Sequence, residues 1–533
     1  MSVLEAPQPT RAASILAVVC GAAFTINLAT TAVNIALPTL ARELTASTQQ
    51  LQWIVDGYNL VFATFVLAAG SLSDRFGRKG ALQLGLVIFG LAAAAASFAA
   101  SPLQLIAGQA VMGLGAAIIY PTTLSIISNV YVQPAQRARA IGLWGAVTGV
   151  GVATGPIMAG WLIENASWPA IYLCMTALAA VIIAAVGLVV VTSRDPATPP
   201  VDRLGLLLSV LAMATLVYTI IEAPTRGWAR TPTLAGFAAA ATLLGLFLGW
   251  ERTHNPPMVD LGLLRNPRFT AASGSITAAF FALFGFIFVI TQYLQLLRGY
   301  GPLSTGLRIM PVAVSIAVGS VAGTALAVRI GNKAIVAAAL LLLGAAFGWV
   351  AVVETATTDY STIVEQMILM GLGVGATTAP ATEAIMGTVP KEKAGIGSAM
   401  SDATRELGGT LGVAVVGSVY ASVYASTLAK ASIAQQLPAH ALATARSSMT
   451  GALAVANRMI GEGPAAQIVA AANHAFLRGL TAGSFVAAGV AFAGALLAAA
   501  FLPARPKPVP TAAVQPSIAR SSSLGANRPI KEP

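Results

Sequence analysis

Asp56, Asp402 and Glu406 are carboxylic acids that lie inside apolar segments long enough to cross a membrane. An ionisable side chain is costly in the core of a bilayer, so its presence there indicates a function. Asp402, Arg405 and Glu406 follow one another at i, i+3 and i+4, which places them on one face of a helix. A carboxyl group held away from water can exchange a proton near neutral pH, and a cation bound beside it favours release of that proton. The three acids therefore predict a site that exchanges protons for cations.

These acids also have structural interpretations. Asp402 and Glu406 would form a pair with Arg405 in a wet cytoplasmic vestibule, and Asp56 would lie near the outer headgroups. Aromatic faces attract cations, so aromatic and polar side chains of the same segments are expected to line a substrate pocket with Arg405. These further pocket residues are Asn34, Trp53, Tyr58 and Tyr120. The phenylalanines between 280 and 288 are assigned mainly to packing or to lipid contact.

The composition requires a membrane around these segments. Of the 533 residues, 56% are hydrophobic and only 9% are charged, whereas an average soluble domain is about 25% charged. Soluble, disordered and nucleic-acid-binding proteins are thereby excluded, and the net charge of +11 is assigned to basic cytoplasmic loops. The two cysteines lie in apolar runs and the three histidines in polar stretches, so neither a disulfide framework nor a metal site is expected. The sequence has no phosphate-binding loop and no recognisable catalytic group, and we expect neither an enzyme nor a cofactor.

Fourteen apolar runs are long enough to span a bilayer, which takes about 20 residues of helix. They fall at 14–37, 50–72, 81–100, 103–128, 141–163, 169–192, 204–222, 232–250, 270–295, 304–328, 333–353, 363–388, 394–424 and 476–502. An even number of spans places both termini on one side. Lys and Arg are concentrated in the loops of that side, which makes it the cytoplasm. The outer loop at 425–475 is expected to form surface helices, and the Pro-, Ser- and Ala-rich segment at 503–533 a disordered cytoplasmic tail.

An internal repeat groups these helices. Arg75-Phe-Gly-Arg-Lys79 recurs as Arg329-Ile-Gly-Asn-Lys333, 254 residues later. The repeat pairs the second to fifth helices with the tenth to thirteenth, and leaves the seventh and eighth as an insert. The sequence therefore predicts two six-helix halves around a midplane site, an arrangement typical of secondary transporters. The predicted units of this 6+2+6 layout are 14–192, 204–250 and 270–502.

The loop between the second and third helices carries the most specific motif. Gly70-Ser-Leu-Ser-Asp74-Arg75-Phe-Gly77-Arg78-Lys79 fits the pattern G-x3-D-[RK]-x-G-R-[RK]. Gly77 permits a tight turn, and Asp74 lies at a helix end, where it can pair with a neighbouring arginine or cap an adjacent helix. Such a pair holds one conformation and breaks in another, so Asp74, Arg75, Gly77 and Arg78 are predicted to form a conformational switch.

The fifth helix carries a second motif, made of small residues. Gly151, Gly155, Pro156 and Gly160 are spaced so that a neighbouring helix can approach closely, and Pro156 weakens the local backbone ladder. The pattern resembles the antiporter motif of facilitator drug exporters, although one of its glycines is Ala159 here.

The chain as a whole resembles the major facilitator superfamily, and within it the fourteen-helix drug:proton antiporters of the EmrB/QacA type. The resemblance covers about residues 14–502 and is carried by the loop motif and by Thr31-Ala-Val-Asn34, Trp53-Ile-Val-Asp56-Gly-Tyr58 and Asn266-Pro-Arg268-Phe269. It implies an all-α major facilitator fold in the cytoplasmic membrane. It also implies a monomer that exports amphipathic cations in exchange for protons, with acids at Asp56, Asp402 and Glu406.

Two positions depart from the family pattern and keep alternatives open. Ala29 stands where the first helix usually carries an acid, and Gln109 stands where the fourth usually carries an arginine. An uncoupled facilitator is therefore one alternative. A narrow exporter of an endogenous metabolite, antibiotic or lipid is another, and a non-transporting membrane sensor is a third.

Overall fold

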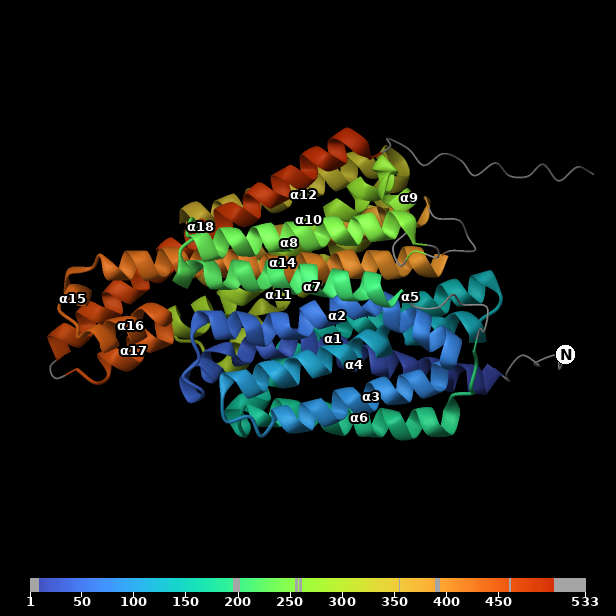
Figure 1. Cartoon of the computed structure of the whole chain (residues 1–533), viewed down its shortest axis with the longest axis horizontal. Helices are drawn as coiled ribbons and strands as arrows, with labels where there is room; N and C mark the ends of the chain where they lie inside the picture. The colour runs from blue at the N-terminus through green and yellow to red at the C-terminus, as the bar shows by residue number, and fades with distance from the viewer. Residues whose placement is uncertain are drawn as a thin grey trace, which may run out of the picture.

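The computed structural model describes residues 9–194, 202–254, 257, 261–353, 355–388, 394–459 and 462–502. Within these ranges the chain is helical without strands, and fourteen helices are long and apolar enough to cross a membrane, which confirms the predicted all-α membrane fold. The long helices run side by side in one bundle (Figure 1). The tail predicted to be disordered, 503–533, lies outside the described residues.

The first six spanning helices form the amino-terminal half. They are α1 (Pro9–Glu43), α2 (Thr48–Phe76), α3 (Arg78–Ala96), α4 (Pro102–Val130), α5 (Pro134–Asn165) and α6 (Pro169–Val189). Ser47 begins α2 with a capping box, because its side chain accepts from the Gln50 N–H while the Gln50 side chain accepts from the Ser47 N–H. Proline opens α4, α5 and α6 at a position where its missing N–H has no helical partner to lose.

Two inserted helices, α7 (Arg203–Arg226) and α8 (Thr231–Thr253), form a hairpin beside the bundle. α7 packs against α2 of the amino-terminal half and against α14 (Ala394–Ala429) of the other half. Val217 and Ile221 of α7 are buried together with Leu60 of α2 and Ala414 of α14. The insert therefore covers one of the two seams along which the halves meet.

The carboxy-terminal half contains the remaining six spans. After the short α9 (Leu261–Leu264) come α10 (Pro267–Gln292) with its π-helical end η1 (Tyr293–Leu297), α11 (Pro302–Ile330), α12 (Asn332–Val353), α13 (Tyr360–Met386), α14 and α18 (Glu462–Phe501). The repeated loop takes the same form in both halves. Gly77 (φ 124°) separates α2 from α3, and Gly331 (φ 92°) separates α11 from α12, a conformation that favours glycine.

The segment expected to be an outer loop is largely helical. α14 continues to Ala429 and α18 begins at Glu462, so both exceed the apolar runs of the sequence, because alanine-rich stretches extend a helix beyond its membrane span. Between them lie α15 (Ser432–Gln435), α16 (Ala439–Ser447) and α17 (Met449–Ala456), which project from one end of the bundle (Figure 1). We call this the capped end, and the opposite end, where α1 begins and α18 stops, the open end.

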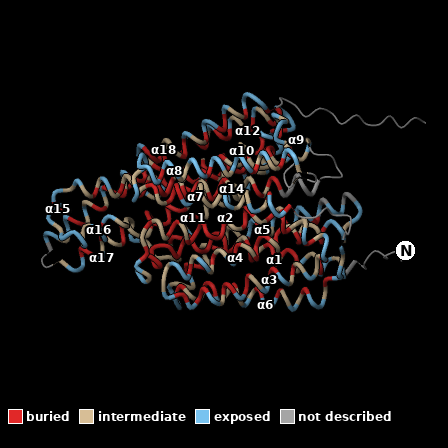
Figure 2. The backbone as a smooth tube through the Cα atoms, in the orientation of Figure 1, coloured by how far each residue is buried: buried red, intermediate tan, exposed pale blue. Residues whose placement is uncertain are grey.

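The two halves meet at the capped end. Several hydrogen bonds between described residues of the two halves lie there. The side chain of Gln52 donates to the carbonyls of Val413 (3.1 Å) and Ala414 (3.0 Å), Gln295 donates to Ile35 (2.9 Å), the Leu303 N–H donates to Glu164 (3.0 Å) and Thr48 donates to Ser447 (2.9 Å). Buried positions are concentrated along the middle of the bundle, where these helices pack (Figure 2).

The halves separate toward the open end. A Cβ atom added to Gly160, near the capped end of α5, would lie 2.6 Å from the Leu303 Cα of α11. Near the open end of α5 the same test at Gly142, Gly145 and Gly149 meets nothing within 4 Å. α5 and α11 therefore touch at one end and diverge, which opens a cleft between the halves at the other.

Replacement of Gly160 by valine is expected to destabilise the capped end. The added side chain must push α5 and α11 apart, and such overpacking costs about 1–3 kcal/mol. Purified Gly160→Val should therefore melt several degrees below the wild type in detergent, when unfolding is followed by thermal denaturation. Gly142→Val is the matched control, since it carries the same valine on the same helix in open space. Equal melting points for the two variants would contradict the close approach of α5 and α11.

Candidate functional site

A cluster of charges on α14 lies in the cleft. The Arg405 Nη1 atom is 3.8 Å from the Asp402 Oδ1 atom, and Glu406 lies one residue further along the same face. The Arg405 guanidinium also lies over the Phe280 ring of α10, 5.1 Å from its centroid. The side chains of Asp402 and Arg405 remain 15% and 28% exposed, so both can be reached from the open cleft.

Two tyrosines of the amino-terminal half face this cluster. Tyr120 of α4 interacts electrostatically with Asp402, Arg405 and Glu406, and Tyr58 of α2 interacts with Glu406. Groups from both halves therefore share one electrostatic environment. The structure brings together five of the residues that the sequence singled out, from three helices and both halves.

An aromatic chain fixes the two tyrosines. The ring of Tyr58 lies 6.1 Å from that of Phe62, Phe62 lies 5.7 Å from Tyr120, and Tyr120 lies 5.0 Å from Trp144 of α5. The Tyr58 hydroxyl donates to the Ile26 carbonyl of α1 at 3.3 Å. These contacts fix the orientation of both phenols, since edge-to-face and tilted ring pairs of this kind stabilise their geometry.

A polar stripe on α1 continues the site. Asn27 interacts with Tyr120 and Thr30 interacts with Tyr58, while Asn34 lies one to two turns further toward the capped end. The sequence analysis selected Asn34 and missed Asn27 and Thr30. Their signal was present as polar residues at i, i+3 and i+7 in an otherwise apolar helix, a spacing that places them on one face.

Beyond the charges, the space between the halves becomes apolar. A small cavity of about 40 Å³ lies among α1, α5, α10 and α11. Leu283 in its wall comes three residues after Phe280, about 4.5 Å further along α10, so the cavity adjoins the charged cluster. Its polar lining residues are Thr31, Asn34 and Thr291, and its apolar ones include Ile35, Val152, Ile287, Ile309, Met310 and Ile316.

Asp56 occupies a different environment. It is 0% exposed, and neither of its oxygens has a hydrogen-bonding partner in the part of the chain that the structure describes. It shares a face of α2 with Gln52 and Asn59, and Gln52 binds α14 across the closed seam. A charged carboxylate buried without a partner costs several kcal/mol, so the neutral carboxyl is the form that fits this seam. No described interaction joins Asp56 to the acids of α14, which makes it a separate acidic site.

Trp53 is the one predicted pocket residue that lies apart from both the cluster and the cavity. Its ring packs beside Tyr218 of α7, with 6.3 Å between the centroids. This position is on the side of α2 that the insert covers. The sequence cannot distinguish the two sides, because aromatic residues suit a buried helix contact as well as a pocket.

The loop motif forms a pair inside one half. The Arg78 Nε donates to the Asp74 Oδ1 at 2.7 Å across the turn that Gly77 makes between α2 and α3. Arg75 lies over the ring of Phe76, 5.7 Å from its centroid. All four predicted switch residues therefore lie at the open end, where the halves are apart.

The motif residues of α5 lie on two faces of the helix, and each face packs against a different helix. An added Cβ at Gly151 or Gly155 would lie 2.8 Å from a carbonyl oxygen of α1, so these two glycines pack inside the amino-terminal half. Pro156 and Gly160 face α11 instead, and a Cβ at Gly306 would lie 2.5 Å from the Pro156 carbonyl oxygen. The motif thus joins α5 to its own half on one side and to the other half on the second.

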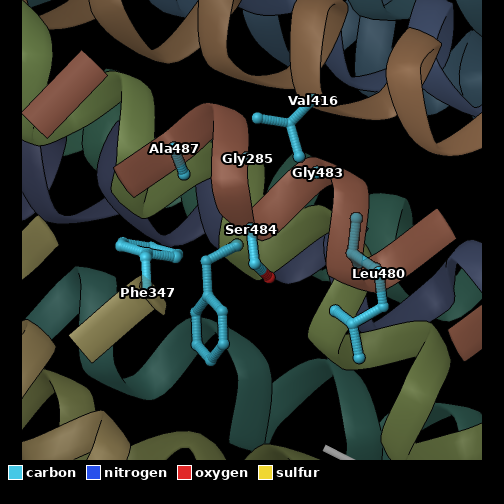
Figure 3. A pocket seen from close by; sticks show the side chains of 9 residues that line it. Gly285, Phe347, Val416, Leu480, Gly483, Ser484 and Ala487 are labelled. Carbon is cyan, nitrogen blue, oxygen red and sulfur yellow. The ribbon is translucent and has the colours of Figure 1, made fainter. Parts of the chain in front are cut away.

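A second cavity lies inside the carboxy-terminal half and is not part of this site. It has a volume of only about 10 Å³ and lies among α10, α12, α14 and α18. Figure 3 shows its lining, in which Ser484 contributes a polar side chain beside Phe347, Leu480 and Val416. Elsewhere, no three His, Cys, Asp or Glu side chains of the described chain form a group suited to a metal ion.

Comparison with known proteins identifies relatives along most of the chain. The sequence profile described as Major Facilitator Superfamily matches residues 19–413. The multidrug resistance protein Stp of Mycobacterium tuberculosis is 34% identical over 405 residues, which cover 76% of this chain and 75% of Stp. The multidrug efflux pump LfrA of Mycolicibacterium smegmatis is 31% identical (84% and 88% covered), and the methyl viologen resistance protein SmvA of Salmonella typhimurium is 32% identical (84% and 89%).

Solved structures show the same fold at low sequence identity. A bacterial homologue of the human lysosomal transporter Spinster, in an inward-facing and unoccupied conformation, gives a TM-score of 0.64 at 16% identity. The match covers 94% of this chain and 100% of that one. The POT family transporter PepTSo gives 0.59, also at 16% identity, with 93% and 98% covered.

Loss of the Gln52 side chain is expected to loosen the seam between α2 and α14. Gln52→Leu removes hydrogen bonds between the halves, and a net loss of about 1 kcal/mol makes opening of the capped end roughly fivefold more frequent. Opening is measured as the rate of maleimide labelling of a thiol introduced by Ala414→Cys, in a chain without Cys20 and Cys174. Gln109→Leu is the control, because Gln109 donates to Tyr172 inside one half. If both substitutions accelerated labelling equally, the seam would not depend on Gln52.

Proposed function

This chain belongs to the major facilitator superfamily, and we propose that it is a proton-driven exporter of amphipathic drugs or other toxic compounds, cations among them. It is a multi-pass integral protein of the cell membrane. Its relatives carry names such as multidrug efflux pump and methyl viologen resistance protein, which supports drug export as its work. The observation that carries the proposal is the pair of acids on α14, reachable from the cleft and next to an apolar cavity between the halves.

The open end faces the cytoplasm in this proposal. Basic loop residues such as Arg75, Arg78, Arg137 and Arg139 lie at that end, and positively charged loops stay inside. Both termini are then cytoplasmic, and the conformation is one that takes substrate from inside the cell. The halves 14–192 and 270–502 would rock about the central site, with the pair at 204–250 holding one seam.

Exchange follows from competition at one site. A cation that enters the cleft favours the ionised forms of Asp402 and Glu406, so their protons leave to cytoplasmic water. After the halves rock, the same carboxylates face the outside, where external protons bind them and expel the cation. Each carboxyl group thus either carries a proton or interacts as a carboxylate with a bound cation. This competition couples proton entry to cation export.

Asp56 adds a second control to this cycle. Its neutral carboxyl is sealed while the capped end is closed, and it reaches water only when that end opens. A proton on Asp56 would therefore favour return to the inward-open state. Coupling then rests on Asp56, Asp402 and Glu406, because Ala29 and Gln109 stand where the family usually carries an acid and an arginine.

The coupling role of α14 is tested by ethidium transport in proteoliposomes with an imposed proton gradient. Wild-type protein should accumulate ethidium, and the variant with Asp402→Asn and Glu406→Gln should lose accumulation because neither proton nor cation is bound. Glu222→Gln is the control, since that acid pairs with Arg226 on α7 outside the cleft.

Retained uphill transport in the double variant would contradict the role of α14. Wild-type flux that ignores the gradient would establish the uncoupled facilitator. Binding of ethidium without flux would favour the sensor, and transport confined to one endogenous compound would favour the narrow exporter.

Asp74→Asn is expected to block the cycle without removing the substrate site. The substitution removes the charge that pairs with Arg78 at 2.7 Å, and charge-assisted hydrogen bonds contribute about 1.5–3 kcal/mol. Ethidium flux should fall about tenfold or more, while ethidium binding to the purified protein, followed by fluorescence, stays within about twofold of wild type. Arg137→Gln removes an exposed charge at the same end and should leave both quantities unchanged. Weakened binding in Asp74→Asn would place that residue in the substrate site instead.

A further inference from the structure

The guanidinium of Arg405 forms no hydrogen-bonded ion pair with an acid among the described residues. Among the described residues Asp402 is the acid within ion-pair distance, and at 3.8 Å its oxygen is too far for a hydrogen bond. Glu406 acts at longer range, the Phe280 ring lies beside the guanidinium, and the Tyr120 phenol, which is neutral, forms a hydrogen bond with it. The Nε atom is buried without a hydrogen-bonding partner in the described chain. Arginine has five N–H donors in a planar fork, so most of its capacity for oxygen ligands stays unused.

The neighbouring acids also have incomplete hydrogen bonding. The Oε2 atom of Glu406 is buried without a hydrogen-bonding partner among the described residues. Arginine and carboxylate groups that stabilise one another form short, often bidentate contacts of about 2.7–2.9 Å. Asp402 and Arg405 are adjacent on one helix face and yet do not form one. The guanidinium and the carboxyl groups therefore both remain available to bind a ligand.

The space next to these charges limits which kind of ligand can bind there. Arg405 is 28% exposed toward the cleft, and the apolar cavity starts about one helical turn beyond Phe280. The lining of the cavity is mostly apolar, so the apolar part of a ligand would lie along these walls. Its polar end would then lie against Arg405, Asp402 and Glu406 together.

We propose that Arg405 binds an anionic oxygen of the substrate, and that the site prefers amphoteric molecules, which carry a carboxylate as well as a cation on an apolar ring system. This inference rests on the proposed export function and narrows its substrate class. A simple cation meets repulsion from Arg405, whereas an amphoteric molecule satisfies the arginine and the acids at once. Arg405 is thus a specificity-determining residue that acts for one class of substrate and against the other.

Rhodamine 123 and rhodamine 110 form a matched pair of probes. They share one ring system and differ in that the first is a cationic methyl ester, while the second has a free carboxylate. For wild-type protein in proteoliposomes, kcat/KM should be higher for rhodamine 110. Arg405→Gln should lower that value for rhodamine 110 about tenfold or more, because a charge-assisted contact is lost, and should leave rhodamine 123 unchanged or improved. Arg405→Lys should restore part of the preference, since it restores the charge without the planar fork.

A control variant and a binding measurement keep the outcomes distinct. Arg308→Gln removes an arginine that lies over Tyr300 at the capped end and should not change the ratio of the two dyes. An equal loss of both dyes in Arg405→Gln would show that Arg405 only supports Asp402, and would overturn the inference while export stands. If wild-type protein transports neither dye, the export proposal fails for this class. The Kd ratio measured by fluorescence anisotropy then decides the inference, because a ratio unaffected by Arg405→Gln overturns it.

Discussion

Incompletely paired charges inside a membrane protein are the constraint on which this structure depends. Asp402, Arg405 and Glu406 cannot face lipid, and they do not satisfy one another at hydrogen-bonding distance. They lie where the halves diverge toward the open end, which leaves the side chains of Asp402 and Arg405 partly exposed. That divergence in turn needs a firm contact elsewhere, which the close approach of α5 to α11 and the Gln52 hydrogen bonds provide at the capped end. The insert α7–α8 covers the seam between α2 and α14 and leaves the seam between α5 and α11 without such a cover.

The acids fall into two environments that a rocking motion would exchange. Those on α14 are reached through the cleft, whereas Asp56 is sealed in the contact between α2 and the other half. Opening the capped end would expose Asp56 and would draw the open end together around the Asp74–Arg78 pair. In the proposed cycle, one rigid-body movement would change the access of water to Asp56, Asp402 and Glu406. A local rearrangement is not required, because each acid lies on a long helix of one half.

The sequence was sufficient for the fold and for part of the site. Fourteen apolar runs and a repeated loop predicted the helices and their 6+2+6 order, since span length and repeat spacing are local properties. The i, i+3, i+4 spacing placed Asp402, Arg405 and Glu406 on one face of α14, but it could not show that Tyr58 and Tyr120 come to meet them from the other half. Their proximity depends on tertiary structure, which the spacing does not give. The same holds for the burial of Asp56 and for the packing of Trp53 against α7. The polar face of α1 was visible in the sequence, yet polar residues in a membrane helix equally bond to their own backbone.

The most direct test of the central claim is proton release on substrate binding. Purified protein in weakly buffered detergent is titrated with ethidium while a pH-sensitive dye reports free protons, without membrane, gradient or turnover. Competition between cation and proton on α14 predicts that protons are released in step with ethidium binding, and that the variant with Asp402→Asn and Glu406→Gln releases none. Binding of ethidium to wild-type protein without proton release would contradict the account, as would equal release from the variant.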